Sequence, residues 1–178
     1  MPKASKKSIQ EIYEENQLRN SPLKQPETWL WLHDIRSAHN VGSAFRSADA
    51  FGVSGIILSG FSPKPPKPEV CKTALGAENS VKWLFLEQPS EIATHFPKQQ
   101  YQYLGIEQTH GSIPLQHFKP NKQKGRILLF GNEVRGLDEH LMPLMDDYLE
   151  IPQYGIKHSL NISVAVGICL YAFLTKSF

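Results

Sequence analysis

The sequence predicts an α/β protein in which a parallel sheet carries helices on both faces. From Thr28 onward, short apolar runs recur without clean two-residue alternation, a pattern typical of strands that are covered on both sides. Segments with helical periodicity fall between several of these runs. The chain has 178 residues, of which 40% are hydrophobic and 20% charged, a composition typical of a globular protein with a large core.

Residues 1–27 precede the alternating pattern, and we expect them to form an extension to one domain that spans residues 28–178. Ser8 and Glu11 have the spacing of a capping box, and apolar residues at helical spacing follow. A short amphipathic helix is therefore expected, ending near Arg19 ahead of an Asn-Ser-Pro break.

Within the domain, the predicted strands are the short apolar runs Trp29–Leu32, Gly55–Leu58, Val81–Leu86, Tyr101–Ile106, Ile127–Phe130 and Tyr148–Ile151. The predicted helices cover residues 40–51, 89–96, 137–145 and 159–175. Residues 62–68 contain four prolines and are expected to form an extended loop.

Composition and patterning argue against several classes of protein. Two cysteines, Cys71 and Cys169, cannot form a disulfide framework, so we expect reduced thiols and a cytoplasmic location. The longest apolar stretch, residues 160–174, is shorter than the roughly 20 residues of a membrane span. The basic N-terminus is not followed by the apolar stretch of a signal peptide. The seven histidines are scattered without metal-ligand spacing, so no metal site is expected.

The first segment that could carry chemistry begins at Asn40, a good helix-capping residue. Apolar residues at helical spacing follow it as far as Phe51, and Arg46 points nearly opposite that apolar face. Arg46 is therefore either a functional side chain or an ordinary solvated arginine.

The second segment is a buried strand that runs into a loop bounded by Gly131 and Gly136. Ligands of α/β proteins bind where strands end, so this loop is a candidate binding element. Leu137 and Asp138 occupy the places where a phosphate-binding loop needs Lys and Ser or Thr, which argues against a nucleoside-triphosphate site. An ordinary strand–helix turn is the alternative.

The third segment covers residues 151–165, where a strand leads through a glycine-containing loop to the last helix. Ser159 is expected to cap that helix. Asn161 and Ser163 interrupt an otherwise apolar stretch, and buried polar groups need partners, so they are expected to form hydrogen bonds. Capping and packing alone could also explain them.

The formal net charge is only +2, but two stretches are locally basic. Their basic residues are Lys64, Lys67 and Lys72 in the first stretch, and Lys119, Lys122, Lys124 and Arg126 in the second. These stretches are either phosphate-binding patches or solvated loops.

Together the three segments resemble the TrmH (SpoU) branch of the SPOUT RNA methyltransferases. The resemblance covers about Trp29 to Phe173. It includes Asn40-Val41-Gly42 with Arg46, Phe-Gly-Asn-Glu-Val-Arg-Gly at 130–136, and the segment 151–165, which begins with Ile-Pro and ends with Ser-Leu-Asn-Ile-Ser-Val-Ala. Residues 73–77, Thr-Ala-Leu-Gly-Ala, also resemble a family segment.

This resemblance implies an α/β fold with a C-terminal trefoil knot, S-adenosylmethionine as cofactor, and a homodimer with its active site near the subunit interface. The implied reaction is methylation of a ribose 2′-hydroxyl in tRNA or rRNA. The implied catalytic residues are Arg46, Asn40, Glu133, Ser159 and Asn161. The implied cofactor contacts are Leu129, Gly131, Ile151 and Leu160, and the lysines of the two basic stretches together with Arg126 are the expected RNA contacts.

Two questions stay open at this level. The family arginine is usually described as the general base, yet an arginine is normally a permanent cation, so Arg46 could instead stabilise charge or hold an RNA phosphate. A catalytically idle RNA-binding relative is the alternative function, whereas a nucleotide-dependent oxidoreductase is disfavoured because no Gly-x-Gly-x-x-Gly is present.

Overall fold

The computed structural model describes residues 5–18 and 26–175 of the chain. Its main feature is a seven-stranded, all-parallel sheet with the strand order β3-β2-β1-β6-β4-β7-β5. The strands are β1 (Thr28–His33), β2 (Gly55–Ser59), β3 (Trp83–Leu86), β4 (Tyr101–Ile106), β5 (Ile113–Pro114), β6 (Gly125–Phe130) and β7 (Asp147–Glu150). All six predicted strands are confirmed, and only the short edge strand β5 was not predicted.

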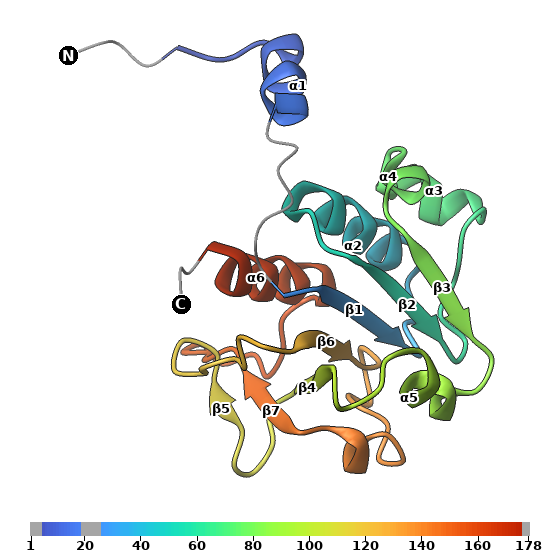
Figure 1. Ribbon diagram of the computed structural model, residues 1–178, viewed down its shortest axis with the longest axis vertical. Helices are drawn as coiled ribbons and strands as arrows, with labels where there is room; N and C mark the ends of the chain where they lie inside the picture. Colours follow the sequence, from blue (N-terminus) through green and yellow to red (C-terminus); the bar gives the residue numbers. More distant parts are fainter. Residues whose placement is uncertain (1–4, 19–25, 176–178) are drawn as a thin grey trace.

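The helices are α1 (Ile9–Leu18), α2 (Ala38–Phe51), α3 (Pro68–Ala74), α4 (Ala77–Ser80), α5 (Ile92–His95) and α6 (Ile162–Thr175). Two single turns of 3₁₀ helix, η1 (Pro89–Glu91) and η2 (Met142–Leu144), complete the described elements. Figure 1 shows α2 and α6 side by side over one face of the sheet, with α5 on the other. The predicted parallel sheet with helices on both faces is thus confirmed.

The sheet separates two apolar clusters because successive strand side chains point to opposite faces. In β1, Leu30 and Leu32 pack with the cluster under α2 and α6, whereas Trp31 packs with Tyr103 on the opposite face. All four side chains are fully or almost fully buried. This packing fixes the register of β1 and β6, and therefore the position of the loops that leave their carboxyl ends.

The predicted helix over 137–145 is wrong, since the segment contains only the single turn η2. Pro143 lies inside the segment and lacks the N–H that a longer helix would need. Leu137 and Leu141 still pack into the core, so the apolar spacing reflects burial of an irregular segment rather than a helix.

The capping box before α1 is confirmed, because the Ser8 N–H donates to Glu11 Oε2 (2.6 Å) and the Glu11 N–H to Ser8 Oγ (3.2 Å). Ile9, Ile12 and Tyr13 on this helix are exposed. The predicted break at residues 20–22 lies outside the described residues. No helix among the described residues is both long enough and apolar enough to cross a membrane.

Candidate functional site

A cleft of about 700 Å³ opens at the carboxyl ends of β4, β6 and β7. Its walls are the loops that follow these strands, together with the start of α6. This is the edge of a parallel sheet at which α/β proteins bind ligands, and the volume suits a small organic molecule.

The loop after β6 forms one wall of the cleft by folding back on itself. The Asn132 N–H donates to the Gly136 carbonyl (2.8 Å), and the Gly136 N–H donates to the Asn132 carbonyl (2.9 Å). A Cβ atom on Gly131 would lie 2.2 Å from the Gly136 carbonyl oxygen, so only glycine permits this close approach. The predicted role of the two glycines in a tight turn is therefore confirmed.

Glu133 projects from this loop towards the beginning of α2. Its carboxylate accepts hydrogen bonds from the Arg36 N–H (2.8 Å), the Ser37 N–H (3.1 Å) and Asn40 Nδ2 (2.9 Å). Burial alone would raise the pKa of Glu133, but these hydrogen bonds together hold that pKa below its ordinary value. Glu133 is therefore a carboxylate at neutral pH, and it fixes the segment that leads into α2.

Asn40 does not cap α2, contrary to the prediction. The helix begins at Ala38, and Ser37 is its cap, with Ser37 Oγ accepting from the Asn40 N–H (3.3 Å). Asn40 therefore lies in the first turn, where its side chain is free to face the loop after β6. Both residue types cap helices well, so sequence alone could not choose between them.

Asn161 connects the third predicted segment to the other two. Its Nδ2 donates to Asn40 Oδ1 (3.2 Å), while its Oδ1 accepts from the Ser163 N–H (2.9 Å) and Ser163 Oγ (2.6 Å). The predicted hydrogen bonds of Asn161 and Ser163 are thus confirmed. Asn161, rather than Ser159, precedes α6 and accepts from its first turn, so the capping role predicted for Ser159 is wrong. Ser159 lies two residues earlier, exposed in the wall of the cleft.

Arg46 lies outside this cluster within a single chain. It is exposed on α2, six residues beyond Asn40, which places it roughly 9 Å farther along the helix axis. Gly42, between them, leaves room for α3, because a Cβ there would lie 2.1 Å from Thr73 Oγ1.

Three of the four expected cofactor contacts, Gly131, Ile151 and Leu160, line the cleft. Leu129 does not, because it is wholly buried between the strands and their covering segments, and the next residue, Phe130, lines the cleft instead. Leu129 lies one residue inside β6, whereas Phe130 is the last residue of that strand and borders the cleft at its carboxyl end.

Glu107 and Gln108, which were not predicted from the sequence, follow β4 and also line the cleft. Glu107 Oε2 accepts from the Leu137 N–H (3.1 Å), and Gln108 Nε2 donates to the His158 carbonyl (3.0 Å). These bonds hold two different walls of the cleft. No local pattern marks either residue, because each contact joins distant segments. Four carboxylates line the cleft, Glu107, Glu133, Glu139 and Glu150, against the single arginine Arg135, so the lining is acidic on balance.

The two basic stretches lie at opposite ends of the sheet. Lys64, Lys67 and Lys72 are exposed in the segment after the carboxyl end of β2, at the end of the sheet that carries the cleft. The Lys64 ammonium lies 3.8 Å from the centre of the Phe85 ring. Lys119, Lys122 and Lys124 precede the amino end of β6, and Lys124 Nζ donates to the Lys98 carbonyl (2.7 Å).

Arg126 does not fit its expected role as an RNA contact. It is only 3% exposed, and its guanidinium lies 5.4 Å from the centre of the Phe173 ring of α6. Its Nε and Nη1 atoms have no hydrogen-bond partner among the described residues. The cause is its position in β6, where side chains on this face point into the apolar layer beneath α6.

Comparisons with known proteins agree with this geometry. Residues 27–171 match the SpoU rRNA methylase family. The chain is 33% identical over 162 residues to the 23S rRNA (guanosine-2′-O-)-methyltransferase RlmB of Escherichia coli K12, covering 89% of this chain and 65% of that protein. It is 26% identical over 151 residues to the tRNA (guanosine(18)-2′-O)-methyltransferase of Aquifex aeolicus, covering 83% of this chain and 69% of that protein.

Among solved structures, the SpoU methyltransferase AviRb from Streptomyces viridochromogenes, in complex with AdoMet, superposes with a TM-score of 0.77. The sequences are 26% identical, and the match covers 89% of this chain and 60% of that one. The chain thus spans about two thirds of the length of these relatives.

Proposed function

Because the chain belongs to the SpoU rRNA methylase family, we propose that it methylates a ribose 2′-hydroxyl of tRNA or rRNA with S-adenosylmethionine as donor. One observation carries the proposal: Glu133, Asn40 and Asn161 form a continuous hydrogen-bonded cluster beside a cleft at the carboxyl edge of the sheet. Three segments that are far apart in the sequence thus converge where a reaction could take place.

The residues of the cleft fit the proposed cofactor. Gly131 permits a tight turn in which a Cβ atom would clash with the backbone of Gly136. Gly131, Ile151 and Leu160 would hold the nucleoside largely by backbone and apolar contact. The acidic lining favours a cationic ligand, and S-adenosylmethionine carries a sulfonium and an ammonium group. When bound, the cofactor supplies an electrophilic methyl group.

Methyl transfer needs accurate positioning, and the chain's own residues can provide it. Glu133 would hold Asn40 in place, and Asn40, Ser159 and Asn161 would orient the ribose of the substrate. Arg46 would act as a fixed cation that stabilises negative charge as the 2′-hydroxyl gives its proton to a substrate phosphate or to water.

Arg46 does not line the cleft of its own chain, so the proposal includes a homodimer in which a second copy of the chain supplies it. Val164, Ile168 and Tyr171 of α6 support this, because they are exposed and share one face of the helix. α2, which carries Arg46, packs beside α6, so a dimer formed through α6 would bring Arg46 near the partner's cleft.

RNA would approach from the end of the sheet that carries the cleft. Lys64, Lys67 and Lys72 lie at that end and are the proposed phosphate contacts, whereas Lys119, Lys122 and Lys124 would meet only a more distant part of a large RNA. The proposal also includes the C-terminal trefoil knot. Its support is the likeness to SpoU structures and the placement of β7 between β4 and β5 before the chain returns to α6.

A hybrid dimer tests the function and the role of Arg46 together. One chain carries Arg46→Ala and the other Gly131→Ala, each with its own affinity tag, and the purified hybrid is assayed for methyl transfer to undermethylated bulk RNA. If Arg46 serves the partner's cleft, the hybrid keeps one of its two sites and about half of the wild-type activity.

Three results would contradict parts of the proposal. An inactive hybrid would place Arg46 and the cleft in the same chain. A wild-type chain that binds RNA and cofactor without transferring methyl groups would identify an idle relative. A chain that is monomeric in solution would contradict the proposed dimer.

A further inference from the structure

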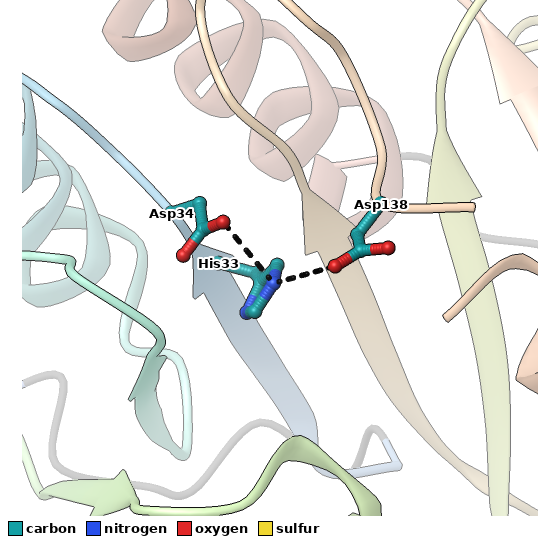
Figure 2. A group of neighbouring side chains, drawn as sticks. All are labelled: His33, Asp34 and Asp138. Atoms are coloured by element: carbon teal, nitrogen blue, oxygen red, sulfur yellow. Dashed lines mark ion pairs between the residues drawn. The ribbon is translucent and has the colours of Figure 1, made fainter. Parts of the chain in front are cut away.

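We propose that His33, Asp34 and Asp138 form a binding site for one divalent first-row transition metal, with Zn²⁺ the best match. Figure 2 shows their three side chains converging on one space, His33 and Asp34 from the end of β1 and Asp138 from the segment that follows Gly136. This inference is independent of the proposed methyl transfer.

The spacing of the three facing atoms suits a shared metal ion better than direct hydrogen bonds. His33 Nε2 lies 3.6 Å from Asp34 Oδ2 and 3.5 Å from Asp138 Oδ2, which is long for a hydrogen bond. Tetrahedral zinc with ligand bonds of about 2.0–2.2 Å places its ligands about 3.3–3.6 Å apart. All three atoms lie within 4.8 Å of one another, so only a small closure of the two carboxylates is needed.

The remaining polar atom of each side chain is already held by the protein. His33 Nδ1 lies 2.8 Å from Ser59 Oγ, and Ser59 Oγ accepts from Trp31 Nε1 (2.8 Å). Asp34 Oδ1 accepts from the Phe61 N–H (3.1 Å), and Asp138 Oδ1 accepts from the His140 N–H (2.8 Å). Metal ligands are typically oriented in this way by partners on their far side, which leaves the near atoms free to coordinate.

Burial of the histidine points to a cation in this space. The His33 side chain is only 5% exposed, and its Nε2 faces two carboxylates. If Nδ1 donates its proton to Ser59 Oγ, the lone pair of Nε2 points at two negative charges, and a metal ion satisfies all three atoms. The two aspartates are about one third exposed and leave a path for an ion to enter from solvent. One imidazole and two carboxylates, with a place for water, suit zinc and its neighbours.

A metal ion here would brace the wall of the cleft. Asp138 directly follows Leu137, whose N–H is held by Glu107, and the Asp34 carbonyl accepts from Asn132 Nδ2 (2.8 Å) in the loop that carries Glu133. The ion would therefore tie the end of β1 to both ends of that loop. Sequence spacing did not reveal the group, because Asp138 is distant in the chain from the other two residues.

The test is titration of the chelator-treated full chain with Co²⁺ and Zn²⁺. Co²⁺ bound by nitrogen and oxygen ligands absorbs visible light, so absorbance reports coordination directly, and calorimetry gives stoichiometry. The expected result is one ion per chain, displacement of Co²⁺ by Zn²⁺, and a rise in the unfolding temperature on binding.

Asp34→Asn, Asp138→Asn and His33→Gln are the test variants, with His117→Gln as control because His117 is exposed and outside the group. The two asparagines keep an acceptor for the Phe61 and His140 amides and replace only the facing oxygen. Loss of an outer partner alone typically weakens metal binding about 10–100-fold, so each variant should weaken it at least tenfold, and the control should not.

Failure to bind one ion saturably would overturn the proposal. Binding that survives in Asp34→Asn and Asp138→Asn would overturn it too. These two variants decide the matter even if His33→Gln does not fold, since their side chains are partly exposed and keep their volume. Neither absorbance nor calorimetry depends on methyl transfer, so failure of this site and failure of the proposed function are distinguishable.

Discussion

Replacing Glu133 by glutamine removes the acceptor that joins the loop after β6 to the beginning of α2. The carboxylate accepts three hydrogen bonds, two at Oε1 and one at Oε2. A glutamine amide keeps one acceptor oxygen and turns an NH₂ group towards the remaining N–H donors. The variant therefore loses at least one hydrogen bond to a charged acceptor and leaves its donor unsatisfied.

A hydrogen bond to a charged group contributes about 1.5–3 kcal/mol, so the Glu133→Gln variant should lose about 2 kcal/mol of unfolding free energy. For a chain of this size that corresponds to a fall of about 4–8 °C in unfolding temperature. Because the beginning of α2, which carries Asn40, is then held less firmly, methyl transfer should fall by up to roughly a hundredfold.

The pH dependence supplies an independent check. The folded-state pKa of Glu133 is lowered, so its contribution is present above the unfolded-state pKa of about 4.3 and is lost as pH falls through the folded-state value. The difference in unfolding temperature between wild type and Glu133→Gln should thus be full at pH 7 and shrink below about pH 4.

Calorimetric unfolding from pH 3 to 8 and methyl-transfer kinetics measure both effects. Glu139→Gln is the matched control for the unfolding temperature, because Glu139 lines the same cleft but is exposed. Equal unfolding temperatures for Glu133→Gln and wild type at pH 7 would refute the argument that Glu133 stabilises the beginning of α2, as would an equal fall in unfolding temperature in Glu139→Gln.

Three further predictions concern single residues. Gly131→Ala should abolish binding of S-adenosylhomocysteine in calorimetry, because its Cβ would lie 2.2 Å from the Gly136 carbonyl oxygen; unchanged affinity would contradict the required close approach. Arg126→Met should raise the unfolding temperature by about 2–4 °C, because it removes a buried cation whose Nε and Nη1 have no partner among the described residues. Apolar packing of the methionine offsets the lost contact with Phe173. A lower unfolding temperature would show that the guanidinium stabilises the fold. Ser37→Ala should cost about 1 kcal/mol in urea unfolding through loss of the α2 cap, whereas Ser43→Ala, inside the same helix, should cost less.

The sequence predicted the strands well because a sheet buried on both faces requires apolar runs whatever the surrounding contacts. It predicted segment ends less well. Ser37 and Asn40 compete as caps of α2, and Ser159 and Asn161 compete at α6, so the choice depends on partners supplied by the tertiary fold. The helix expected over 137–145 shows that burial of Leu137 and Leu141 can imitate helical spacing.

The convergence of Asn40, Glu133 and Asn161 could be expected only from the family resemblance. No local pattern links residues that are brought together by strand order. Arg126 illustrates the reverse error: a cationic stretch suggested an exposed patch, but the last of its residues enters β6 and points into the core. Which face a strand residue occupies is decided by register, and register depends on the neighbouring strands.

The contact between Glu133 and the backbone of Arg36 joins residues 97 positions apart. The first turn of α2 is synthesised long before Glu133, which hydrogen-bonds to it. A nascent chain that has emerged only as far as β4 therefore contains the α2 segment but lacks this hydrogen-bond acceptor. Ordering of the Asn40 side chain is thereby postponed until the strand in the middle of the sheet has been inserted. A truncated or misassembled chain would then lack the ordered cluster of Glu133, Asn40 and Asn161. The proposed methyl transfer therefore requires the completed fold.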